Sequence, residues 1–138
     1  MATYNKIYDF AEQLCLGLHH LNAAGDVLKV YLTNVLPTSG MTTKGDLAEI
    51  TATFGYPTGG TDIANDLSEA TGTATVTAVD VTFTASGGSF GPFRYAVVYN
   101  DTHATDALVC WWDYGSSISC LDGESFKVDF GASMFTLA

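Results

Sequence analysis

Basic residues are scarce in this sequence. Of its 138 residues, five are Lys or Arg and fifteen are Asp or Glu, which gives a formal net charge of −10. The sequence pI is near 4.2. A surface this acidic repels phosphate backbones and anionic headgroups, so we expect neither nucleic acid nor a membrane as a partner.

Long apolar runs are also missing. No stretch approaches the roughly 20 apolar residues that a membrane-spanning helix needs. No apolar run follows Lys6 near the N-terminus, so the opening residues lack the pattern of a secretory signal. We therefore expect the protein to be made and folded in a cytoplasm.

Cysteines are few, and their spacing fits neither zinc nor thioredoxin-like chemistry. The three residues Cys15, Cys110 and Cys120 cannot all pair within one chain, and none belongs to a C-x-x-C motif. In a reducing compartment we expect free thiols, with Cys15 and Cys110 buried. A Cys110–Cys120 bridge is the alternative, because both residues lie near a predicted hairpin.

Charged residues make up only 14% of the chain, whereas 47% of the residues are hydrophobic. This balance excludes an intrinsically disordered chain. The length is that of one domain and is sufficient to bury a core. We expect a single domain over residues 1–138, with a helical segment at 1–25, a β-rich body at 26–138 and an irregular surface excursion at 41–71.

The N-terminal segment has apolar residues at helical spacing. At about 100° per residue they form one stripe, and its members are Ile7, Phe10, Ala11, Leu14, Leu18 and Leu21. The pattern predicts a helix over residues 4–22 that ends before Gly25. Leu16 points almost opposite the stripe, which makes it a candidate partner contact.

From Asp26 onward the apolar period changes from about 3.6 to 2, which predicts strands. Strands are expected at 27–34, at 73–85 with a turn or bulge near Val79 and Asp80, at 93–99, at 107–112, at 126–130 and at 133–137. Those at 93–99 and 107–112 are apolar on both faces, which is typical of central strands. The predicted fold class is mainly β (α+β), an antiparallel β-sandwich or open barrel with the helix packed on it.

The excursion at 41–71 is the least regular segment, and a short helix is expected within it around residues 62–70. Long surface loops on a rigid scaffold often carry function, so partner contacts are expected here, with Tyr56 as a candidate.

No catalytic motif stands out. The available bases are His19, His20 and His103, and the first two are helix neighbours that point roughly 100° apart. No G-x-S-x-G motif is present. We expect no catalytic residues, cofactor or resident metal, although a calcium ion near Asp101 and Asp106 remains open.

Aromatic residues gather at Trp111 and Trp112, followed by Asp113 and Tyr114. Adjacent strand residues face opposite ways, so one Trp is expected in the core and the other on the opposite face. We regard both Trp residues as candidate partner contacts, with a core or oligomer-interface role favoured. Stacking on sugar rings, as in a carbohydrate-binding β-sandwich module, remains an alternative.

Three motifs lie in the second half of the chain, at residues 94–102 (RYAVVYNDT), 112–117 (WDYGSS) and 122–130 (DGESFKVDF). Together they resemble a group of small virion proteins of tailed bacteriophages and marine phage-like sequences. The opening, with a short helix followed by a strand near residues 28–32, is also similar. The resemblance covers most of the chain except residues 41–71.

Proteins of this group look like head-decoration (capsid cement) proteins and, less often, like tail or fibre components. The resemblance implies a non-enzymatic virion protein that binds the major capsid protein on the outer head surface and bridges neighbouring capsomers. It also implies a homo-oligomer, such as a trimer, that assembles in the host bacterial cytoplasm. A tail or fibre-attachment subunit is the alternative within the same class.

Overall fold

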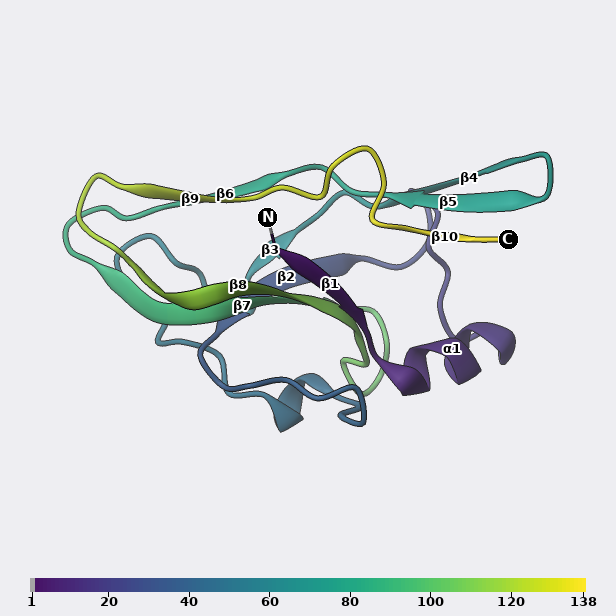
Figure 1. Ribbon diagram of the computed structural model, residues 1–138, viewed down its shortest axis with the longest axis horizontal. Coiled ribbons are helices and arrows are strands. Elements are labelled where there is room, and N and C mark those ends of the chain that lie inside the picture. Colours follow the sequence, from purple (N-terminus) through teal and green to yellow (C-terminus); the bar gives the residue numbers. More distant parts are fainter. Residues whose placement is uncertain (1) are drawn as a thin grey trace.

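The computed structural model describes residues 2–138 and contains two layers of antiparallel strands with one α-helix beside them (Figure 1). The larger layer, the main sheet, has the strand order β1-β8-β7-β2-β3. Its strands are β1 (Thr3–Lys6), β2 (Leu28–Thr33), β3 (Thr61–Asp62), β7 (Phe90–Asn100) and β8 (Leu108–Cys120). The predicted mainly β, antiparallel, sandwich-like fold class is confirmed, and the sheets do not close into a barrel.

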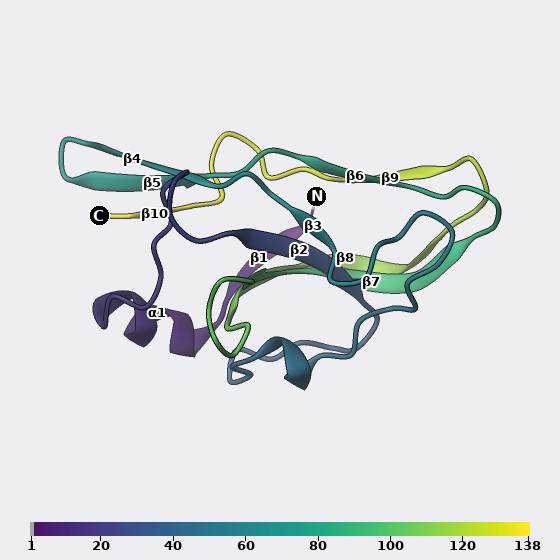
Figure 2. The same ribbon diagram turned by 180° about the vertical axis from the view of Figure 1, so that it is seen from behind.

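The second layer is a long ribbon that runs over the main sheet. Its strands are β4 (Asp66–Ala70), β5 (Thr73–Thr77), β6 (Val81–Thr84), β9 (Ser125–Val128) and β10 (Phe135–Leu137). One piece has the order β10-β5-β4 and the other pairs β6 with β9. Because β5 leads into β6 and β9 leads into β10, the two pieces lie end to end (Figures 1 and 2).

The break between the two pieces is unequal on its two sides. Only residues 78–80 join β5 to β6, whereas residues 129–134, the connecting loop, join β9 to β10. The break confirms the interruption predicted near Val79 and Asp80. A tight turn at Asp122 and Gly123 joins β8 to β9, and Gly123 has a φ of +87°.

The core is centred on β7 and β8. All residues at 95–100 and at 108–112 are buried, which confirms that these are the central strands. The ribbon covers one face of the main sheet, and the segment that carries the short 3-10 helix η1 (Lys44–Asp46) runs past the other face (Figure 1). Both faces are therefore covered, as expected for strands that are apolar on both sides.

The predicted helix over residues 4–22 is wrong in its extent. Residues 3–6 form β1, which pairs with β8 and places Tyr4 opposite Trp112. The helix α1 covers only Tyr8–Cys15. It ends before Gly17, whose φ of +74° lies in the left-handed region that favours glycine. Strand pairing satisfies the backbone groups along the edge of β8, a gain that the local apolar spacing does not reveal.

The shortened helix also changes the environment of Cys15. We expected this thiol to be buried, but Cys15 is exposed at the end of α1. Cys110, in contrast, is buried as expected, and Cys120 is buried too. All three cysteines are free, so the structure does not contain the alternative Cys110–Cys120 disulfide.

Residues 62–70, predicted to contain a short helix, have none: Asp62 ends β3, residues 63–65 connect the strands, and residues 66–70 form β4. Leu67 of β4 lies opposite Val76 of β5, so long-range pairing overrides the local pattern. The preceding turn is held tightly against β2. A Cβ atom at Gly60, where φ is +75°, would lie 1.8 Å from the carbonyl oxygen of Val30.

Candidate functional site

Of the four candidate partner contacts, only Leu16 lies on the surface, with 63% of its area exposed. Tyr56 is 2% exposed, because its hydroxyl donates a hydrogen bond to Glu49 and accepts one from the backbone N–H of Leu32. Trp111 and Trp112 are also buried, since both lie on the central strand β8. Tyr56 is therefore a buried structural residue and not the surface contact that we expected.

The acidic and histidine candidates do not form a metal site. Within residues 2–138, no three His, Cys, Asp or Glu side chains are grouped so that they could hold one metal ion. Asp101 forms an ion pair with Lys29, with 3.2 Å between the two charged groups. Asp106 has an unusual φ of +51° at the end of the same loop.

His19 lies in a buried polar network that the sequence did not reveal. Its Nδ1 is 2.9 Å from the side-chain nitrogen of Asn100, and its Nε2 is 3.0 Å from Oε1 of Gln13. The amide oxygen of Asn100 accepts hydrogen bonds from the backbone of Thr102 and His103. The Asn100 nitrogen must then donate to His19 Nδ1, which places the proton of the neutral ring on Nε2.

This network also includes Asp26, whose carboxylate is 2.7 Å from the Asn100 side-chain nitrogen. Burial, together with the nearby ring of His103, lowers the pKa of His19 to about 4. Burial alone would raise the pKa of Asp26, but hydrogen bonds from His20 and Asn100 lower it overall. The network ties the segment after α1 to the end of β7 and keeps His19 neutral.

An apolar groove of about 300 Å³ lies between the β10-β5-β4 sheet and residues 14–22, which include the end of α1 and the segment that follows it. The strand register places Leu67, Val76 and Phe135 in one row across that sheet, and Ala74 lies opposite Leu137 in the next. Leu67 is 41% exposed and Leu137 is 61% exposed. The groove is thus only partly covered within the chain.

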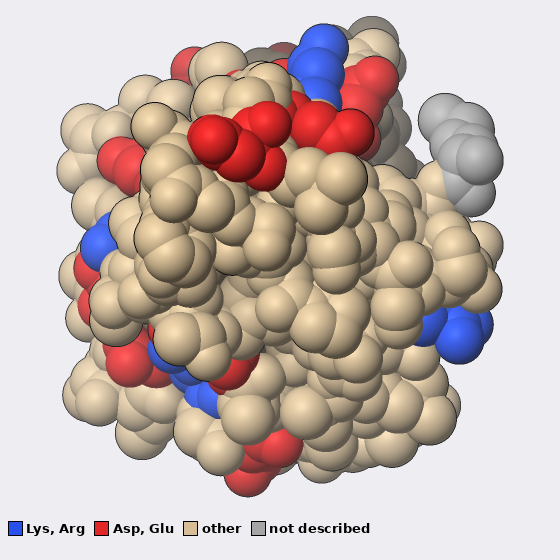
Figure 3. Space-filling view, turned by 90° about the vertical axis from the view of Figure 1, so that its left-hand side faces the viewer, with Lys and Arg blue, Asp and Glu red and all other residues tan. Residues whose placement is uncertain are grey.

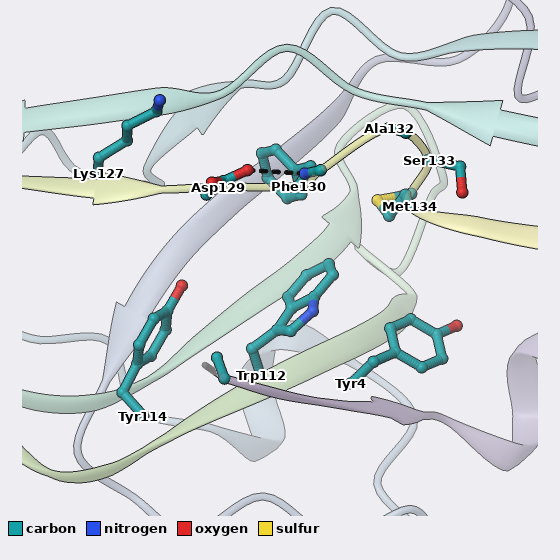
Figure 4. Close-up of a pocket in the computed structure, with 11 residues that line it drawn as sticks. Tyr4, Trp112, Tyr114, Lys127, Asp129, Phe130, Ala132, Ser133 and Met134 are labelled. Atoms are coloured by element: carbon teal, nitrogen blue, oxygen red, sulfur yellow. Dashed lines mark hydrogen bonds between the residues drawn. The ribbon is translucent and has the colours of Figure 1, made fainter.

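A second, larger cavity of about 620 Å³ lies between the main sheet and the ribbon (Figure 4). Tyr4, Trp112 and Tyr114 project into it from β1 and β8, and the connecting loop forms the opposite wall. We call this the aromatic cavity. Sequence alternation places Trp112 and Tyr114 on the same face of β8, so this pair was detectable from the sequence.

The aromatic rings of this cavity hold one another in place. The rings of Tyr4 and Trp112 meet edge to face with centroids 5.6 Å apart, and Phe130 meets Trp112 in the same way at 5.4 Å. On the other side of the cavity, Tyr114 packs edge to face on Phe126 at 5.0 Å. Burial, and next the charge of Asp129, raises the pKa of Tyr114 to about 12, so its hydroxyl is protonated at neutral pH.

Comparisons with known proteins identify no relative of this chain. No helix within residues 2–138 is long and apolar enough to cross a membrane. No protein-family model, no curated protein and no solved structure matches the chain.

Proposed function

We propose that this chain is a non-enzymatic structural subunit of a bacteriophage particle, a capsid decoration protein. It binds the outer surface of the head through the major capsid protein and bridges neighbouring capsomers as a homo-oligomer such as a trimer. The three sequence motifs at 94–102, 112–117 and 122–130 provide the resemblance on which the assignment to a phage particle rests.

The observation that carries this proposal is the open apolar groove at one end of the molecule. The β4–β5 hairpin projects beyond the end of the main sheet (Figures 1 and 2). The groove lies on the face of the β10-β5-β4 sheet that is turned towards α1. Apolar surface of this kind is costly in water and favours burial against a partner. Leu16, at the end of α1, adds a further exposed apolar side chain on this side of the chain.

The opposite end of the molecule offers a second contact surface, which a bridging protein needs. The connections β6–β7 and β8–β9 lie there, and charged side chains on this face gather towards its rim (Figures 1 and 3). Phe54 and Leu121 are 48% and 60% exposed, and the carbonyl of Phe54 accepts a hydrogen bond from Ser86 in the β6–β7 connection. We call this surface the loop end.

Charge bears on how the contact forms. A net charge of −10 favours solubility of the free protein before assembly. Its binding surface on the shell must be less acidic, so binding depends on salt. Stable protein contacts bury about 1,200–2,000 Å² per pair, so the contact at each end must extend beyond the exposed apolar side chains named above.

The test is to add purified protein to phage heads that lack it. We expect saturable binding at symmetry-related positions and release of DNA at a higher temperature, because a ligand that binds only the assembled state stabilises it. Density on tails alone would move the assignment to a tail or fibre subunit. Absence of any particle binding would refute the proposal.

Matched variants locate the contact. Leu137→Asp places a charge in the groove, and Leu121→Asp places one at the loop end, so both are expected to weaken binding at least tenfold. Val79→Asp is the control, because Val79 is 62% exposed, as much as Leu137, but lies in the link between β5 and β6. Equal loss of binding in all three variants would show that general charge, rather than these two surfaces, controls the contact.

A further inference from the structure

We propose that the aromatic cavity binds a neutral sugar residue, as a ligand site separate from the surfaces proposed to contact the capsid. None of its lining residues belongs to the groove or to the loop end. Its volume of about 620 Å³ lies within the range of about 300–1,000 Å³ that is common for small-molecule sites.

One wall of the cavity supplies aromatic surface. Tyr4 and Trp112 lie opposite each other in the β1–β8 pairing, and Tyr114 is two residues further along β8, so all three side chains stand on the same face of the main sheet (Figure 4). Aromatic rings that also carry a polar group suit a ligand with both C–H and hydroxyl surfaces. A pyranose ring has this mixed character.

The polar groups of the cavity have capacity for a ligand. Figure 4 shows one hydrogen bond between the residues drawn there, from the Gly131 backbone N–H to Asp129 at 2.8 Å. The hydroxyls of Tyr4 and Tyr114 and the indole N–H of Trp112 are therefore bound to none of the other residues that line the cavity. A hydrocarbon ligand would leave these groups without partners, at a cost in binding free energy.

The charges of the lining disfavour an anionic ligand. Lys127 and Asp129 are the two charged residues of the lining, and their charges are opposite. Lys127 is paired with Asp80 at 3.1 Å, so it is not a free cation that would select an anion. The strong negative charge of the whole chain disfavours anions further. A neutral polyhydroxylated ligand avoids this repulsion.

The connecting loop is anchored, so the cavity is formed before a ligand arrives. At one end, the Phe130 N–H donates to the Asp80 carboxylate at 2.9 Å. At the other end, the Met134 N–H donates to the Val76 carbonyl at 2.7 Å. The loop has six residues where the opposite side of the ribbon has three, and the extra length forms the second wall of the cavity. Prior ordering of this kind reduces the entropy cost of binding.

The test is an NMR titration of the full chain with methyl glycosides of common neutral hexoses and N-acetylhexosamines, up to tens of millimolar. We expect at least one sugar to shift the Trp112 indole signal and the backbone amide signals of residues 131–134, while the signals of Leu67 and Ala74 in the groove stay unchanged. No shift with any sugar would overturn the inference. So would shifts confined to the groove, or tighter binding of inorganic phosphate or of an apolar probe such as cyclohexanol.

The variant Tyr114→Phe removes only one hydroxyl and is preferred to substitution of the buried Trp112, which endangers folding. It should weaken sugar binding at least fivefold. Tyr8→Phe is the matched control, because Tyr8 is 70% exposed on α1 and outside the cavity, and its affinity should equal that of the wild type. Equal affinities of all three proteins would overturn the assignment of the cavity. Binding to phage heads is measured separately, so failure of this inference is distinguishable from failure of the proposed function.

Discussion

Acidification should destabilise this protein between pH 6.5 and 4, because the fold keeps His19 neutral. In the unfolded chain His19 has an ordinary pKa near 6.5, and in the folded protein its pKa is about 4. Above pH 6.5 the imidazole is neutral in both states and contributes no pH dependence. Below that, the unfolded state binds a proton that the folded state does not, so stability falls as the pH falls through this window.

The magnitude follows from the shift. A difference of one pKa unit corresponds to about 1.4 kcal/mol, and the shift from 6.5 to about 4 therefore gives a loss of about 3 kcal/mol once the pH is below both values. The geometry explains why the cost is large. Protonation would place a second N–H on Nδ1, where the Asn100 amide already donates, so two donors would face each other at 2.9 Å.

Chemical denaturation at several pH values tests this reasoning. The wild-type free energy of unfolding should fall steadily from pH 7 to pH 4.5. In His19→Asn, stability at pH 7 is lower because ring packing on Phe10 is lost, but most of the pH dependence in this window should disappear. Tyr8→Phe is the control, since Tyr8 lies on α1 with 70% of its area exposed and makes no contact with the network, and it should keep the wild-type slope.

Asp26 should lose its contribution to the free energy of unfolding at a lower pH than His19 does. The folded-state pKa of Asp26 is lowered, so Asp26 contributes stability above its unfolded value of 3.8 and loses it only as the pH falls further. NMR titration of the histidine ring signals should place His19 below pH 5. A His19 midpoint near 6.5, or an unchanged slope in His19→Asn, would refute the proposed origin of the acid sensitivity.

Three further predictions follow from packing and thiol exposure. Gly60→Ala should destabilise the fold by more than about 3 kcal/mol, because its Cβ would meet the Val30 carbonyl, whereas Gly72→Ala, at a similar φ with nothing within 4 Å, should cost about 1–2 kcal/mol in thermal denaturation. Asn65→Ala should cost about 2–4 kcal/mol in the same assay, since Asn65 bonds the backbone of Leu21, Asp26 and Leu28; a loss below 1 kcal/mol would contradict this. A native thiol titration should modify Cys15 alone and a denatured one all three cysteines, because burial raises the pKa of Cys110 and Cys120; reaction of Cys110 in the native state would contradict its burial.

The sequence was sufficient for the elements whose signal is local. The strands around residues 95–100 and 108–112 are apolar on both faces, and any arrangement that buries them must place them centrally. The break at 78–80 likewise follows from nearby residues. The change of period at Asp26 predicted β2, but it did not mark the start of the β-structure, because β1 at residues 3–6 belongs to the same sheet.

The secondary-structure predictions were wrong where pairing with a strand distant in the sequence determined the structure. Tyr4 is a strand residue because β8 has an edge to be paired, and Leu67 is a strand residue because β5 lies beside it. Neither partner is visible within a window of neighbouring residues. The same limit hid the His19 network, which joins residues 13, 19, 26 and 100.

The candidate surfaces show the same dependence on topology, and their placement has a consequence for function. Alternation on β8 reveals Trp112 and Tyr114 as one face, but Tyr4 and the connecting loop reach that face only through the sheet order and the end-to-end ribbon. The break in the ribbon places the aromatic cavity between its two pieces, whereas the groove and the loop end lie at opposite ends of the molecule (Figure 1). A subunit held by its two ends therefore has no need of the cavity residues for attachment. Under the two proposals, a substitution at either end should therefore leave sugar binding unchanged, and a substitution in the cavity should leave binding to the head unchanged.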